Sequence, residues 1–83
     1  MEVSNKNYQS SLHAAERLVE RFNEIAINIV EAGYILPKLM ARSVPVNKKH
    51  HRPWIKSYLN TDLNAILVVN EDKKVVVTIY KVR

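Results

Sequence analysis

The fold is decided by the C-terminal stretch AILVVNEDKKVVVTIYKV, residues 65–82. Two runs rich in β-branched residues, Ala65 to Val69 and Val75 to Val82, flank the polar segment Asn70-Glu71-Asp72-Lys73. Such runs on either side of a short polar segment are typical of a β-hairpin. Strict alternation in the second strand predicts one face made of Val75, Val77 and Ile79 and another made of Val76, Thr78 and Tyr80.

The hairpin needs a layer to cover its apolar face, and the N-terminal part of the chain supplies one. Apolar residues recur there at alternating spacings of about four and three: Tyr8, Leu12, Ala15, Val19, Phe22, Ala26 and Ile29. This stripe predicts helix from about Asn5 or Gln9 to Ala32, either as one rod or as two segments hinged near Phe22–Glu24. Gly33, the only glycine, is then expected to form a left-handed C-terminal cap.

The middle of the chain is less regular. Tyr34 to Leu36 is compatible with an edge strand, because Pro37 has no amide hydrogen to give to a further strand. Ser43 to Pro53 holds two prolines and is expected to be an exposed loop, followed by a strand from Trp54 to Leu59. A turn is expected at Asn60-Thr61-Asp62.

We therefore expect one α+β domain that spans residues 1–83. Its N-terminal helix or helix pair, residues 5–32, packs on a three- to four-stranded antiparallel sheet with a C-terminal β-hairpin. Residues 34–59 supply an edge strand, a basic loop and a further strand, and residues 64–82 supply the hairpin.

Composition narrows the class of protein. The 83 residues include 13 Lys/Arg against 8 Asp/Glu, a net charge of +5, and no cysteine. A small chain without cysteine fits a reducing compartment, and no apolar run approaches the roughly 20 residues that span a bilayer. With a single glycine the chain cannot build a glycine-rich phosphate loop. We expect a cytoplasmic protein without a cofactor and without membrane contact, and the positive charge favours RNA or another polyanion as a partner.

The positive charge is concentrated in an acid-free stretch, Pro37 to Lys56. Its candidate nucleic-acid-binding residues are Lys38, Arg42, Lys48, Lys49, His50, His51, Arg52, Trp54 and Lys56. Lysine and arginine can grip phosphates while a base stacks on an indole. The alternative is a disordered basic loop with the tryptophan buried in the core. The adjacent histidines do not predict a metal site, because neither a cysteine nor a carboxylate lies near them in sequence.

A second constellation lies in the predicted helix. His13, Arg17 and Arg21 follow one another at intervals of four and form a ridge nearly opposite the apolar stripe. The histidine could move a proton while the arginines stabilise charge on a phosphate, as phosphodiester chemistry requires. Acidic residues three positions after each member favour instead a solvated face of ion pairs: His13/Glu16, Arg17/Glu20 and Arg21/Glu24.

These motifs occur in a familiar order. HAAERLVER, residues 13–21, resembles the H-A-x-x-R-x-x-x-R opening of a bacterial and phage family of unknown function, which is similar to the barnase/EndoU/RelE-like ribonuclease toxins. Its members continue with a second helix ending in glycine, compared here with Ile25–Gly33, and finish on a strand like V-V-T-V-Y, here VVTIY at 76–80. The family usually has a glycine after the second arginine, where this chain has Phe22.

The resemblance implies an α+β fold with helices against an antiparallel sheet. It also implies one RNA-binding face on which these residues converge: His13, Arg17, Arg21, Thr78 and Tyr80. Read from the strand pattern alone, the last two could donate hydrogen bonds to a substrate, and ordinary packing is the alternative for both.

Two classes of function follow. The first is a small basic RNA-binding protein that acts as a metal-independent endoribonuclease of toxin type, with His13 or one of His50 and His51 as general acid and base. The second is a non-catalytic, phage- or plasmid-type interaction module that inhibits or regulates a host protein or nucleic-acid machine and dimerises through the Tyr8–Ile29 stripe. A sequence-independent nucleic-acid binder is the plainest reading of the charge.

Overall fold

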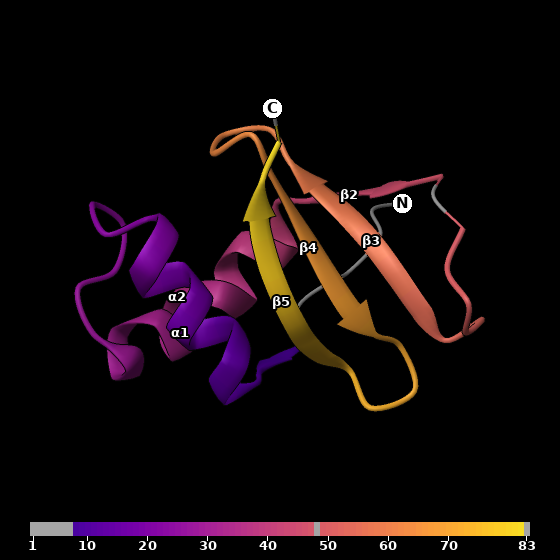
Figure 1. Ribbon diagram of the computed structural model, residues 1–83, viewed down its shortest axis with the longest axis horizontal. Coiled ribbons are helices and arrows are strands. Elements are labelled where there is room, and N and C mark those ends of the chain that lie inside the picture. Colours follow the sequence, from indigo (N-terminus) through magenta and orange to yellow (C-terminus); the bar gives the residue numbers. More distant parts are fainter. Residues whose placement is uncertain (1–7, 48, 83) are drawn as a thin grey trace.

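The computed structural model describes residues 8–47 and 49–82, which form two helices and a five-stranded mixed sheet (Figure 1). The elements are β1 (Gln9–Ser10), α1 (Leu12–Arg21), α2 (Ile29–Ala41), β2 (Val44–Val46), β3 (Ile55–Asn60), β4 (Ala65–Asn70) and β5 (Val75–Lys81). The strand order is β1-β5-β4-β3-β2, and β1 pairs with β5 in parallel. The α+β class is confirmed, but the prediction of three to four antiparallel strands is wrong, because short strands extend the sheet at both edges.

The first strand occupies a segment expected to be helical. Gln9 and Ser10 pair with the start of β5. Ser11 then has an extended backbone, and its hydroxyl accepts a 3.0 Å hydrogen bond from the amide of Ala14. This serine cap starts α1 at Leu12. The alternative helix start at Asn5 lies outside the described residues.

The helical layer consists of two helices. Of the two arrangements expected, one rod or two hinged segments, the second is confirmed. α1 ends at Arg21, and the chain leaves helical geometry at Phe22, which confirms the hinge near Phe22–Glu24. Asn28 restarts the chain as a helix, because its side-chain oxygen accepts a 2.8 Å hydrogen bond from the amide of Glu31. Phe22 and Ala26 are buried in the turn between the helices.

The second helix contradicts two expectations. α2 continues through Gly33, which has no positive φ and caps nothing, and through the Tyr34–Leu36 segment expected to be an edge strand. Ala32, Leu36 and Met40 repeat at four-residue spacing and are fully buried, so tertiary packing holds the segment helical. This packing outweighs the backbone hydrogen bond that Pro37 cannot make.

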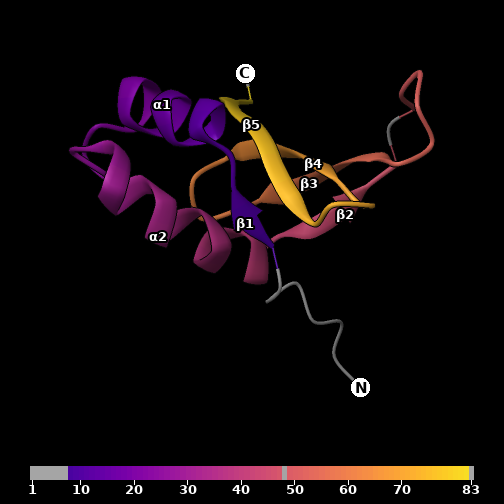
Figure 2. The ribbon, with the colours of Figure 1, turned by 90° about the horizontal axis from the view of Figure 1, so that it is seen from below.

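Both helices lie together at one side of the sheet, with the β2–β3 connection at the far end (Figure 2). Ala65, Leu67 and Val69 of β4 face them and are buried. The core also holds much of the Tyr8–Ile29 stripe that was expected to form a dimer: Tyr8, Ala15, Phe22 and Ala26. Those residues pack inside the protomer and are not available to a second chain.

The hairpin is confirmed, but its facial alternation is not. Val68 pairs with Thr78 and Val69 pairs with Val76, so Val77 is an extra residue in β5. This β-bulge shifts the alternation by one residue. Val76 and Ile79 therefore both face the helices and are buried, while Thr78 and Tyr80 share the opposite face.

The remaining segments follow their expectations in part. The strand expected at Trp54–Leu59 is β3, and the turns after β3 and β4 are confirmed at residues 61–64 and 71–74. The loop expected at Ser43–Pro53 is shorter, because Val44–Val46 forms the edge strand β2. Pro45 is acceptable there since an edge strand need not donate outward. Within the described residues, no helix has both the length and the apolar composition that crossing a bilayer requires.

Candidate nucleic-acid interface

One face of the sheet is left uncovered by the helices. Strand register assigns to this open face the residues of β2 to β5 that alternate with the helix-facing ones: Val44, Val46, Ile55, Ser57, Leu59, Ile66, Val68, Asn70, Val75, Thr78 and Tyr80. No carboxylate, lysine or arginine occurs among these eleven residues. The open face is therefore an apolar, acid-free surface with one phenol.

The described part of the basic loop between β2 and β3, residues 47 and 49–54, lies at the rim of the open face. Nε2 of His50 is 2.8 Å from Oγ of Ser57, which is itself buried on that face. The guanidinium carbon of Arg52 lies 5.5 Å from the ring centroid of Trp54, in cation–π range. Lys48 lies outside the described residues. The cation Arg52 and the half-buried Trp54 of the loop thus lie beside the apolar open face.

Few of the predicted binding cations are neutralised. Among the described residues, no carboxylate forms an ion pair with Lys49, Arg52 or Lys56. Arg42 differs, because its Nη2 lies 3.1 Å from the carboxylate of Asp62. Lys38 lies on α2 and is exposed.

The helical ridge lies at the other edge of the sheet. Arg17 forms a 2.6 Å ion pair with Glu20, and His13 is exposed at the start of α1. Arg21 donates from Nη1 to the carbonyl oxygen of Ile79 at 2.9 Å. Two of the three ridge residues thus use their charge within the protomer, as the solvated-face alternative expects for Arg17.

One cleft unites residues from two of the predicted motifs. An open cavity of about 670 Å³ is lined by Glu20, Arg21, Tyr80, Lys81 and Val82. It brings Arg21 of α1 together with Tyr80 of β5, and Thr78 lies on the same face of β5 as Tyr80. Two cations and a phenol line this cleft beside one glutamate.

The cleft and the basic loop are not neighbours. α1 packs against β5, whereas the loop joins β2 to β3, and β4 separates β5 from β3 in the sheet (Figure 1). The open face connects the two regions. Neither His50 nor His51 therefore joins the His13 ridge in one catalytic pocket.

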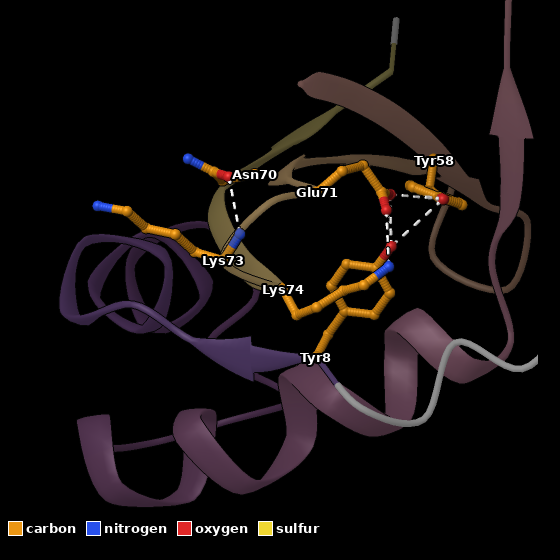
Figure 3. Close-up of polar contacts among 6 residues, drawn as sticks. All are labelled: Tyr8, Tyr58, Asn70, Glu71, Lys73 and Lys74. Carbon is orange, nitrogen blue, oxygen red and sulfur yellow. Dashed lines mark hydrogen bonds and ion pairs between the residues drawn. The ribbon is translucent and has the colours of Figure 1, made fainter. Parts of the chain in front are cut away.

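A polar cluster that the sequence did not predict lies on the helix-facing side of the sheet (Figure 3). The hydroxyls of Tyr8 and Tyr58 both donate to Oε2 of Glu71, the second at 2.8 Å. Nζ of Lys74 lies 2.9 Å from the other carboxylate oxygen and 5.1 Å from the ring centroid of Tyr8. The cluster ties the N-terminal strand, β3 and the hairpin turn together.

These contacts change how the cluster ionises. Burial of Tyr8 and its hydrogen bond to Glu71 raise the pKa of that phenol, and burial does the same to the pKa of Tyr58. Burial alone would raise the pKa of Glu71, but hydrogen bonds from Tyr8, Lys74 and Tyr58 outweigh it and lower that pKa. The cluster is thus a carboxylate held between neutral phenols and an ammonium group, which is a structural clasp.

No metal site accompanies these groups. In residues 8–47 and 49–82, no three His, Asp or Glu side chains lie close enough together to hold a metal ion.

Comparison of the chain with models of protein families, with curated proteins and with solved structures gives no match. The resemblance to a toxin-like ribonuclease family stays a prediction.

Proposed function

We propose that this protein binds single-stranded RNA across the open face of its sheet. The observation that supports this most is the junction of two surfaces. The basic loop, whose Lys49 and Arg52 form no ion pair among the described residues, bonds through His50 to Ser57 on an apolar face that carries no acid. We place the protein in the cytoplasm, in keeping with its lack of cysteine.

The two surfaces suit the two parts of a nucleotide. Lys49 and Arg52 attract phosphates, and each phosphate contact releases counterions. Aliphatic side chains and the ring of Tyr80 accept the flat faces of bases, and the half-buried Trp54 adds a second ring at the loop end. A ribose and base lying on the open face would leave the phosphates beside the basic loop.

Single-stranded RNA fits this division better than a duplex does. In a duplex the bases are stacked and paired, so a protein meets mainly phosphates and hydroxyls. The apolar open face would make no stacking contacts with the bases of such a ligand. The lack of a carboxylate on the open face removes the repulsion that would otherwise oppose a polyanion.

Fluorescence anisotropy with a labelled single-stranded RNA tests the proposal. We expect binding that weakens steeply with salt and a Lys49→Glu variant that loses about tenfold or more in affinity at low salt. Lys73→Glu is the matched control, because Lys73 is also exposed and lies in the β4–β5 turn. Equal losses in both variants, or equal affinity for duplex and single strand, would refute binding at the loop and the open face.

A second candidate function is metal-independent RNA cleavage, which the shared cleft favours. Arg21 and Tyr80, from two predicted catalytic motifs, line it together with Lys81. In this reading His13 moves the proton, Arg17 and Arg21 stabilise phosphate charge, and Thr78 and Tyr80 hold the substrate.

Cleavage of a radiolabelled RNA in the presence of EDTA tests the second candidate. Cleavage by the purified protein that His13→Ala abolishes would support it, with Glu16→Ala as a control on the same exposed helix face. If neither wild type nor variant cleaves while both bind RNA, the protein is a binder only.

A further inference from the structure

Helix α2 is apolar on both of its sides. Its inner side packs into the core through Ala32, Leu36 and Met40. On its outer side the residues Val30 and Tyr34 are 71% and 72% exposed. A helix that is apolar all round is normally buried all round. The outer side is therefore a surface without its partner.

The exposed and half-buried residues of this side form a regular seam. Its members follow one another along α2 at spacings of four, three and four: Val30, Tyr34, Pro37 and Ala41. This is the repeat by which one helix packs along another. Ile27, just before the N-cap residue Asn28, is 70% exposed and adds apolar surface near the N-terminal end of the helix.

The charges of α2 identify the occupant. The helix has two charged residues, Glu31 and Lys38, which lie on the same flank of the seam, three residues before and four residues after Tyr34. We infer that a second copy of this chain covers the seam, with the two α2 helices antiparallel about a two-fold axis near Tyr34. Such an axis keeps each flank on its own side, so Glu31 of each copy faces Lys38 of the other.

Other arrangements use this pattern less well. A parallel pair, whose two-fold axis runs along the helices, would put the two charged flanks on opposite sides of the seam, so Glu31 of one copy would not face Lys38 of the other. In the protomer, Lys38 has no carboxylate partner among the described residues, and Glu31 accepts a 2.9 Å hydrogen bond from the amide of Ile27. The charges are thus available for two equivalent ion pairs across the axis.

The contact is small, so the expected dimer is weak. Thirteen residues of helix span roughly 20 Å. An interface of this size belongs to the weak class, with a dissociation constant on the order of micromolar. The inference does not depend on RNA binding, because the seam and the open face belong to different layers of the fold.

Sedimentation velocity on the full chain tests the pairing with two variants. Lys38→Glu leaves two acids and no base on the charged flank of each α2 helix, and Glu31→Lys leaves two bases and no acid there. We expect each variant alone to be monomeric at concentrations where wild type dimerises. An equimolar mixture should form a heterodimer, because each Glu then meets a Lys. Circular dichroism checks that Glu31→Lys, which loses its bond to the Ile27 amide, still folds.

A second pair of variants tests the seam itself. Val30→Asp is expected to abolish dimerisation, whereas Leu12→Asp, at a residue 64% exposed on α1, should leave it unchanged. Wild type that stays monomeric up to about 200 µM overturns the inference, since a functional weak dimer should form by then. Dimers of Lys38→Glu as tight as those of wild type overturn the antiparallel arrangement.

Discussion

The guanidinium of Arg21 holds the free edge of β5 by donating to the carbonyl oxygen of Ile79 at 2.9 Å. β1 pairs only with Val75 and Val76, so the rest of that edge has no neighbouring strand among the described residues. Ser11 makes a similar contact to the carbonyl of Val77 at 3.2 Å. Arg21, which the motif assigns to catalysis, therefore also supplies a hydrogen-bond donor to the unpaired edge of β5.

This contact predicts unequal costs for the two ridge arginines. Arg21→Ala should lower the free energy of unfolding by about 1–2 kcal/mol, because it leaves an edge carbonyl without its charged donor. Arg17→Ala should cost less than about 0.5 kcal/mol, since its ion pair with Glu20 is exposed. Urea unfolding followed by circular dichroism measures both. Equal costs would show that the bond to Ile79 contributes nothing.

The Glu71 cluster predicts a bounded pH range of full stability. The lowered pKa of Glu71 contributes stability above its ordinary value of 4.5, which is lost as the pH falls through the folded-state pKa. The raised pKa values of Tyr8 and Tyr58 contribute below 10.0, and that part is lost as the pH rises above it.

Glu71→Gln should therefore flatten the acid side of a plot of unfolding free energy against pH. Tyr58→Phe should cost about 1 kcal/mol at neutral pH, for one lost hydrogen bond to the carboxylate. An acid limb that is the same in Glu71→Gln as in wild type would contradict this assignment.

Gly33 offers a test of the second helix. Because it lies inside α2 and an added Cβ would meet nothing within 4 Å, Gly33→Ala should stabilise the protein by about 0.5–1 kcal/mol. The measurement belongs at a dilution where the chain is monomeric. Destabilisation would instead indicate the left-handed cap that the sequence suggested.

Trp54 is the only tryptophan and reports on the basic loop. Single-stranded RNA should quench or shift its fluorescence, and Trp54→Ala should weaken binding by roughly tenfold if a base stacks there. Trp54→Phe should keep most of the affinity. Unchanged fluorescence at saturating RNA would place the ligand elsewhere.

Local patterns predicted the local parts of the fold. The hairpin and the hinge near Phe22 depend on residues that are neighbours in sequence. Pro37 predicted an edge strand, but the segment is helical. The burial of Leu36 and Met40 against the sheet, which is distant in sequence, stabilises the helix there. The bulge at Val77 was not predictable, since strand register depends on both partners.

The site shows the same division. The distribution of charge along the sequence predicted the basic loop. Its position beside the open face follows from the strand order, which no short motif encodes. Tyr8 was assigned to a helical stripe, yet its hydroxyl reaches Glu71, 63 residues away. A contact of that sequence separation leaves no periodic signal.

The most direct test of RNA binding on the open face is a methyl-NMR titration of the protein with single-stranded RNA. We predict shifts of the open-face methyl groups of Val46, Ile66 and Val68, together with the basic-loop amides. The methyl groups of Leu36 in the core and Val30 on the outer side of α2 should stay in place. Shifts confined to α1 around His13, or no shifts at saturating RNA, would contradict the account.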